Sequence, residues 1–270
     1  MTETRISQAA VEETTERLSL RERAIVADID RVRVLSADQL QRLHFHELEG
    51  THRDRTRRRA LGRLVTANIL STLDRRIGGA RAGSKGLVYT LDRLGQRVAT
   101  LLRNGDPDAE PRPRKPGEVT ERFLGHCLAI SELYVSIHEE RRQSEVPFKF
   151  AFYTEPESWW FGPSGIWLKP DAHVVLQTEQ VRDRWDVEVD RATESLSTIR
   201  GKLKRYLDQA TSPDVGVEPL MAKVLVTVPG EVRQASITEA VAQMPAPAEQ
   251  LFDVVLHERA AAHVIGELGA

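Results

Sequence analysis

Residues 51–73 read THRDRTRRRALGRLVTANILSTL, and this stretch decides how the first third of the chain is interpreted. Its apolar side chains recur at the spacing of one face of an α-helix: Leu61, Leu64, Val65 and Ile69. Two short strand-like runs follow, 69–73 and 87–91, separated by a basic, glycine-rich stretch. The sequence here therefore predicts a long helix, with Thr51 as its candidate cap, and then a β-hairpin.

Two shorter helices are expected before this one, because each begins with a capping pattern. Ser19-Leu-Arg-Glu22 and Ser36-Ala-Asp-Gln39 both place a Glu or Gln three residues after a serine. A last helix is expected over 92–102. Three helices, a hairpin and a closing helix are typical of a winged helix-turn-helix, so we expect this fold over 19–103, after a polar tail at 1–18.

Positive charge is concentrated in this part of the chain. Residues 51–103 hold twelve Arg and one Lys against three Asp, a net charge of +10 in a protein of net charge −2. On the long helix, the side opposite the leucines carries a stripe that fits a DNA major groove: His52, Arg55, Thr56, Arg59 and Arg63. The side chains expected at its flanks, near phosphates, are Arg53, Arg57 and Arg58. The basic side chains of the wing are Arg75, Arg76, Arg81 and Lys85.

These observations predict double-stranded DNA as a partner of the first domain. The alternative is that an arginine-rich helix is only a solvated surface. Two domains agree with a length of 270 residues. The single cysteine, Cys127, excludes an internal disulfide and a cysteine cluster for zinc. Without a long apolar run or an apolar leader, we expect a cytoplasmic protein that does not enter a membrane.

A proline-rich linker is expected at 104–118, NGDPDAEPRPRKPGE, which places the second domain at 119–270. Helical periodicity returns over 120–142 and again over 194–208. Strand-like runs occupy the intervening and following sequence: 148–153, 167–176, 185–190, 223–228 and 251–256. Together with a helix over 232–243 and a terminal helix, this order predicts a mixed α/β domain with the sequence α-β-β-β-α-β at its start.

Carboxylates at the ends of two of these strands are the candidate chemistry. Asp171 follows Lys169-Pro170 at the start of one strand, and Asp186-Val-Glu188-Val-Asp190 ends the next. Alternate residues of a strand share a face, so these acids would lie together. Buried carboxylates need a partner, and Mg²⁺ or Mn²⁺ held by two of them can activate water against a phosphodiester. The alternative is a wet strand face after an ordinary Pro-Asp turn.

The same residues carry a resemblance to known proteins. Pro170-Asp171 followed by Glu188-Val-Asp190 resembles the PD-(D/E)xK nuclease superfamily. More narrowly, Lys169-Pro-Asp171, then EVDRATE at 188–194, then Lys202-Leu-Lys-Arg-Tyr206 are similar to the replication-relaxation family of plasmids and integrative mobile elements.

The resemblance implies a winged helix joined to a restriction-endonuclease-like domain, in which Asp171 and Glu188 hold the metal and Asp190 assists. The superfamily's strand lysine would fall at Asp190, so Lys202, on the following helix, is the candidate replacement.

Two further features of the sequence each have two interpretations. Glu132 could be an additional metal-shell acid or an ordinary exposed helix glutamate, and the nearby His126 could instead pack in the core. The segment 159–167, WWFGPSGIW, could stack on unpaired bases or could cap the open side of the sheet.

The leading functional hypothesis is a DNA-binding protein of a mobile element that acts in plasmid replication or DNA relaxation. Its second domain would be a Mg²⁺-dependent endonuclease or nickase. The alternative is a non-enzymatic regulator or replication accessory factor with a catalytically silent nuclease fold. Replication or relaxation proteins of the same element, and a second copy of the chain, are compatible partners. The chain has no GxxxxGK[ST] motif, which argues against an ATPase.

Overall fold

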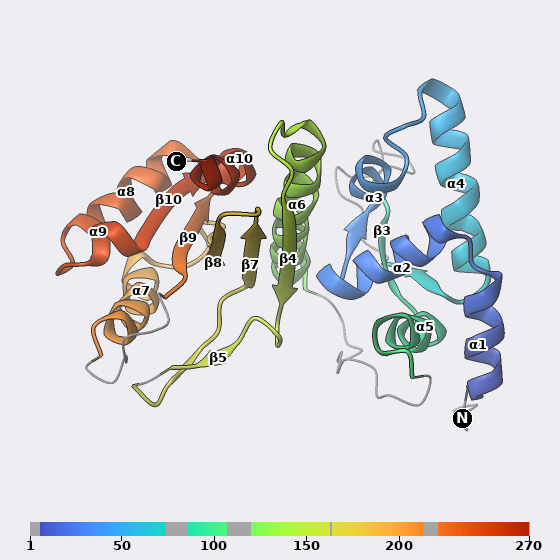
Figure 1. Ribbon diagram of the computed structural model, residues 1–270, viewed down its shortest axis with the longest axis horizontal. Coiled ribbons are helices and arrows are strands. Elements are labelled where there is room, and N and C mark those ends of the chain that lie inside the picture. The colour runs from blue at the N-terminus through green and yellow to red at the C-terminus, as the bar shows by residue number, and fades with distance from the viewer. Residues whose placement is uncertain (1–5, 74–85, 107–119, 163, 213–220, 270) are drawn as a thin grey trace. The chain divides into compact units, whose positions relative to one another are not determined.

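The computed structural model (Figure 1) describes residues 6–73, 86–106, 120–162, 164–212 and 221–269. The chain forms two compact units, Met1–Val135 and Ser136–Ala270. Both units combine helices with a sheet, which confirms the mixed α/β class. Most of the predicted linker, and all but the last residue of the basic stretch predicted as the wing (75–86), lie outside the described residues.

The first unit contains five helices and three short strands in the part of the chain that is described. The helices are α1 (Gln8–Arg17), α2 (Leu20–Val32), α3 (Ala37–His44), α4 (Gly50–Thr66) and α5 (Arg93–Asn104), and the strands are β1 (Leu35–Ser36), β2 (Leu70–Thr72) and β3 (Val88–Leu91). The strands form an antiparallel sheet in the order β1-β3-β2.

Local sequence explains where most of these helices begin. Ser19 and Ser36 both form complete capping boxes, which confirms the predicted starts of α2 and α3. The start of α4 differs from the prediction, because Glu49 occupies the N-cap position and Thr51 lies inside the helix. The expected polar tail contains α1, which Ser7 caps and whose Val11 is fully buried.

A longer helix, α6 (Glu121–Gln143), crosses the division between the units. Its first half belongs to the first unit, where the Ser131 hydroxyl donates to the carbonyl of Val34 at 2.7 Å. Cys127 is buried in a cluster with Val34 and Val88. Residues from 120 to 135 thus pack within the first compact unit, although the sequence suggested that they open the second domain.

The second unit is built on a five-stranded mixed sheet in the order β10-β9-β8-β7-β4. Its strands are β4 (Lys149–Thr154), β7 (Ala172–Gln177), β8 (Arg182–Val189), β9 (Lys223–Val228) and β10 (Phe252–Leu256), and a separate hairpin is formed by β5 (Trp160–Phe161) and β6 (Trp167–Leu168). β4, β7 and β8 run antiparallel to one another, whereas β8, β9 and β10 are parallel.

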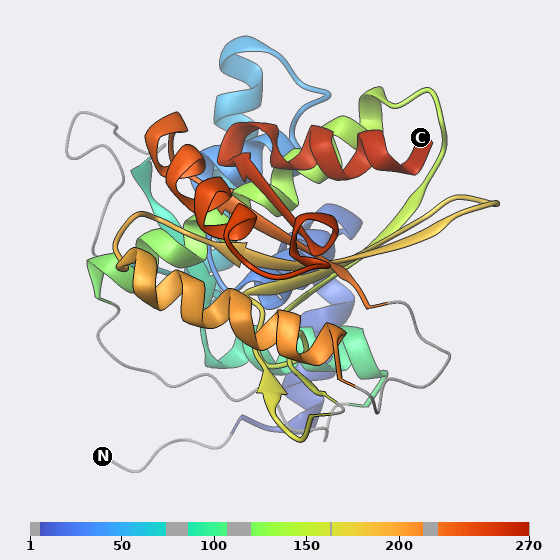
Figure 2. The same cartoon turned by 90° about the vertical axis from the view of Figure 1, so that its left-hand side faces the viewer.

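Helices cover both faces of this sheet. α7 (Leu196–Ala210) and α8 (Glu231–Ala242) contribute Leu203 and Ile237 to one apolar cluster with Val224 and Val226 of β9. The opposite face carries Trp185, whose ring contacts His263 of α10 (Ala260–Gly266). Figure 2 shows α7 and this C-terminal helix on opposite sides of the sheet. A short helix, α9 (Ala248–Leu251), leads into β10.

One predicted strand is divided. The run 167–176 forms β6 and β7 with a break at Lys169–Asp171. Pro170 has no N–H for a strand ladder, and its carbonyl accepts a hydrogen bond from the buried Ser158 hydroxyl at 2.7 Å. The break places Asp171 at the beginning of β7, next to the end of β8.

Candidate functional site

Asp171 and Glu188 lie opposite each other on neighbouring antiparallel strands. The β7–β8 register pairs Ala172 with Val187, so the next residues in line are Asp171 and Glu188. The N–H of Asp171 donates to the carbonyl of Val187 at 2.9 Å, and the N–H of Val189 donates to Asp171 Oδ2 at 2.7 Å. Only 8% of Asp171 and 9% of Glu188 is exposed. Two buried carboxylates therefore share the end of this strand pair.

The surroundings of Glu188 favour a proton or a cation on its carboxylate. The Tyr206 hydroxyl of α7 donates to Glu188 Oε1 at 2.7 Å. Burial and the neighbouring charge of Asp171 raise the pKa of Glu188 to about 8, although Lys202 and Tyr206 act in the opposite direction. In the absence of a bound cation, these surroundings therefore favour the protonated form of Glu188.

Lys202 joins this pair from α7. Its Nζ lies 3.6 Å from Glu188 Oε2 and 3.1 Å from Glu194 Oε2. These two glutamates, together with Asp171, raise the pKa of the Lys202 ammonium against the opposing effect of burial. The side chain of Lys202 is about one-third exposed, so its ammonium also reaches solvent. The structure thus brings Asp171, Glu188 and Lys202 together at the end of the β7–β8 pair.

Asp190 is held differently from the other two acids. It lies one residue beyond β8, and Arg233 of α8 binds it with both Nε and Nη2, at 2.6 and 3.1 Å. The N–H of Ala192 also donates to its carboxylate, at 3.2 Å. Arg233 was not identified from the sequence, because it follows β9 and reaches Asp190 across 43 positions. Its contact gives Asp190 a structural partner.

Asp186 is the most deeply buried acid of this face, with no exposed surface. His173 Nδ1 lies 2.7 Å from Asp186 Oδ1, and Trp160 Nε1 donates to Oδ2 at 3.0 Å. Sequence reasoning did not single out His173. The signal was its position two residues after Asp171, which places both side chains on one face of β7.

The donor chemistry fits a small divalent cation. Mg²⁺ is commonly bound by one or two carboxylates, with water and substrate phosphate as the remaining ligands. Asp171 and Glu188 supply two such carboxylates. Across the described ranges, no three or more His, Cys, Asp and Glu side chains are grouped as a metal site. Asp190, which was expected to assist the ion, is instead bound by Arg233.

A small pocket adjoins Glu188 on the α7 side. Its polar lining comes from Glu188, Asp190, Glu194 and Lys202. It contains about 10 Å³ of water-accessible space, which is close to what one water molecule needs. The pocket therefore gives a water molecule or an ion access to the Glu188 carboxylate.

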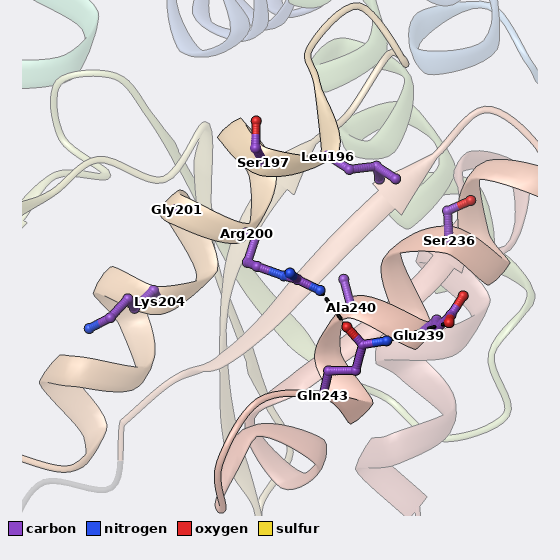
Figure 3. Close-up of a pocket in the computed structure, with 9 residues that line it drawn as sticks. All are labelled: Leu196, Ser197, Arg200, Gly201, Lys204, Ser236, Glu239, Ala240 and Gln243. Carbon is purple, nitrogen blue, oxygen red and sulfur yellow. Dashed lines mark hydrogen bonds between the residues drawn. The ribbon is translucent and has the colours of Figure 1, made fainter.

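A larger groove lies on the outer side of α7 (Figure 3). It has a volume of about 570 Å³ and is lined by residues of α7 and α8. Arg200 crosses it and donates to Gln243 Oε1 at 2.6 Å, while Gly201 leaves the α7 side of the groove without a side chain. None of the acids discussed above lines this groove.

The predicted DNA-contacting helix is α4, and most of its basic side chains reach solvent. Five of the predicted residues are exposed, namely His52, Arg55, Arg58, Arg59 and Arg63, and two are half-buried, namely Arg53 and Thr56. Arg63 also binds Glu22 of α2 through Nε and Nη2, at 2.9 and 2.7 Å. The exposed arginines form a basic surface on this helix.

Arg57 corrects the prediction for the helix flanks. Its side chain is 1% exposed, and its Nη1 donates to the carbonyl of Ala37 at 3.1 Å. The reason is helical periodicity, since Arg57 precedes the buried Leu61 by four residues and Leu64 by seven. The four predicted wing residues, Arg75, Arg76, Arg81 and Lys85, lie outside the described residues.

Glu132 also has a structural environment of its own. Arg42 Nη1 lies 2.5 Å from Glu132 Oε1, and Gln39 Nε2 donates to Oε2 at 2.9 Å. These contacts tie α6 to α3 within the first unit. Glu132 is therefore a helix glutamate that forms an ion pair between two helices.

The two compact units, the mixed sheet and the paired carboxylates define a two-part α/β protein with a candidate acidic site. The chain belongs to the Replication-relaxation family, whose model matches residues 26–216, and this membership implies a role in plasmid replication. The match runs from α2 to beyond α7 and includes Asp171, Glu188 and Lys202. No curated protein and no solved structure gave a significant match.

Among the described helices, none combines the length and apolar character needed to cross a membrane.

Proposed function

We propose that this protein binds DNA of a plasmid or related mobile element through α4 and hydrolyses a phosphodiester at Asp171 and Glu188. The observation that carries the proposal is the meeting of two opposed, buried carboxylates with the Lys202 ammonium. This is the chemistry expected of a PD-(D/E)xK site whose lysine comes from the following helix. In this proposal the second unit is nuclease-like.

In the proposed mechanism, Asp171 and Glu188 would hold one Mg²⁺ or Mn²⁺ ion. When bound, the ion would supply positive charge to the phosphate and lower the pKa of the attacking water. The N–H of Val189 orients the Asp171 carboxylate, and the Tyr206 hydroxyl orients that of Glu188. Lys202 would place its ammonium beside the phosphate oxygens, where negative charge grows as water attacks phosphorus and the ester P–O bond breaks.

For DNA recognition, we propose that the first unit acts as a winged helix-turn-helix. Its α2, α3 and α4 precede β2 and β3 in the order that this fold requires. The exposed Arg55 and Arg59 would meet base edges in the major groove, and Arg58 would contact phosphate. Basic residues between β2 and β3 would add further phosphate contacts.

The test is conversion of supercoiled plasmid to nicked or linear forms with Mg²⁺, with Mn²⁺ and with neither ion. We expect metal-dependent cleavage that Asp171→Asn and Glu188→Gln each abolish and that Lys202→Met slows. Glu179→Gln, in the exposed turn between β7 and β8, is the matched control and should cleave normally. Cleavage that survives both Asp171→Asn and Glu188→Gln would refute the assigned site.

The arrangement of Asp190 favours a second candidate function. Asp190 stands where the superfamily has its strand lysine, and its carboxylate is paired with Arg233. This position therefore makes a structural contact in place of a catalytic one. The unit could thus be a catalytically silent scaffold in a DNA-binding replication accessory factor. Intact DNA binding without cleavage of supercoiled, nicked or single-stranded substrates would support this alternative.

A further inference from the structure

The β5–β6 hairpin has two different faces. Its strands pair Trp160 with Leu168 and Phe161 with Trp167. Because neighbouring residues of a strand point to opposite sides, Trp160 and Leu168 share one face and Phe161 and Trp167 share the other. The aromatic segment that the sequence presented as one cluster is thus divided between two roles.

The inner face fixes the hairpin to the second unit. Leu168 is 2% exposed and belongs to the apolar cluster that α7 covers. Trp160 Nε1 donates a hydrogen bond to the buried Asp186 carboxylate. The buried Gln209 of α7 accepts a hydrogen bond from the N–H of Ser164 at 3.1 Å. A Cβ atom at Gly162 would lie 2.0 Å from Gln209 Oε1, so a larger residue there would require the Gln209 side chain to move. The hairpin is therefore held to the second unit by apolar packing and by hydrogen bonds.

The outer face presents two large aromatic rings to solvent. Phe161 is 60% exposed and Trp167 is 55% exposed. Their ring centroids are 5.6 Å apart in an edge-to-face arrangement. Exposed aromatic pairs are typical of binding surfaces, and unpaired nucleobases are ligands that stack on such rings.

Positive charge near the hairpin favours a nucleic acid as the occupant. Lys169 directly follows β6 and is exposed, and its Nζ lies 4.4 Å from the centroid of the Trp159 ring. On α7, the exposed Arg205 precedes Gln209 by four residues and therefore lies one turn from the point where the hairpin is held. Lys202 lies almost one turn further along the same side of the helix and reaches Glu188. Cationic side chains thus extend from the hairpin to the acidic site.

We propose that Phe161 and Trp167 form a stacking surface for unpaired bases of single-stranded DNA, with Lys169 and Arg205 meeting its phosphates. The inference deepens the proposed function, on which its biological role rests, by naming locally unpaired DNA as the substrate class. In this proposal the inner face of the hairpin packs against the second unit, where Trp160 donates to Asp186, and the outer face binds bases.

Tryptophan fluorescence provides a direct test with the full-length protein. Of the four tryptophans, Trp167 is the exposed one, whereas the other three are partly or fully buried. Stacking of a thymine oligonucleotide, (dT)₈, should quench Trp167 emission. Trp167→Phe should abolish most of the quenching yet keep the affinity, measured by anisotropy of a labelled oligonucleotide, within about threefold, because phenylalanine still stacks.

The double variant Phe161→Ala/Trp167→Ala should bind (dT)₈ about tenfold more weakly and should bind duplex DNA as the wild type does. Val232→Ala removes another highly exposed apolar side chain, on α8, and should change neither affinity. An oligomer of abasic sites has the same phosphates without bases, so the wild type should bind it about as weakly as the double variant binds (dT)₈.

Three results would overturn the inference. The double variant could bind (dT)₈ as tightly as the wild type does, or the wild type could bind the abasic oligomer as tightly as it binds (dT)₈. The third result is a wild-type dimer that the double substitution dissociates. The last would make the surface a contact between copies of the chain. Failure of the proposed nuclease is separable, because Glu188→Gln should lose cleavage and keep (dT)₈ quenching. Plasmid cleavage with unaltered (dT)₈ binding by the double variant would refute only the stacking surface.

Discussion

The protonation of Glu188 should make the stability of the second unit depend on pH. Its carboxyl has a pKa of about 8 in the folded protein, against an ordinary value of 4.5. Between these values the folded state binds more protons than the unfolded state, so the free energy of unfolding falls as pH rises. The difference between these two pKa values corresponds to about 5 kcal/mol of stability, at about 1.36 kcal/mol for each pKa unit.

Glu188→Gln replaces the carboxyl with a neutral group of the same shape and should remove this dependence. Urea unfolding followed by tryptophan fluorescence reports specifically on the second unit, because all four tryptophans lie within 136–270. We expect the wild type to lose several kcal/mol of stability between pH 5 and pH 9, relative to Glu188→Gln. Glu179→Gln is the control and should follow the wild type.

Mg²⁺ should restore the stability of the wild type at pH 9. A cation bound by ionised Glu188 replaces the missing proton and stabilises the folded state by mass action. It should leave Glu188→Gln unchanged. If the wild type and Glu188→Gln lost the same stability between pH 5 and pH 9, the account of Glu188 as a buried, proton-holding carboxyl would be refuted.

Three further predictions concern arginines. Arg233→Ala should destabilise the second unit by about 3 kcal/mol in urea unfolding, because it leaves Asp190 buried without its partner. Arg57→Ala should lower the melting temperature of the first unit through lost burial and a lost hydrogen bond, whereas Arg59→Ala should not. Arg55→Ala/Arg59→Ala should weaken duplex binding and reduce the discrimination between DNA sequences, whereas Arg58→Ala should reduce the slope of log affinity against log salt by about 1, both measured by fluorescence anisotropy. Unaltered binding would contradict the role given to α4.

Features that depend on short stretches of sequence were predictable. The capping boxes at Ser19 and Ser36 need only residues three positions apart, and the apolar run of β9 identifies a strand with the bounds that the structure has. The break before β7 was also predictable, because Pro170 has no N–H to donate to a strand ladder. Its effect was underestimated because the flanking residues are individually good strand formers.

Within the candidate site, the pairing of Asp171 with Glu188 and the approach of Lys202 followed from strand alternation and from the family resemblance. The partners of the remaining acids did not. Arg233 reaches Asp190 from another element, and no local pattern connects them. The burial of Arg57 was predictable, because it continues the stripe of Leu61 and Leu64, but its charge suggested a surface position.

The most direct test of the central claim is calorimetric titration of Mn²⁺ into the full-length protein at pH 8. The claim that Asp171 and Glu188 form a metal site predicts one ion bound per chain, with proton release that grows as pH falls toward 7, because Glu188 must lose its proton. Asp171→Asn and Glu188→Gln should each abolish binding, and Glu179→Gln should not. Absence of binding, or binding that both substitutions leave intact, would contradict the claim.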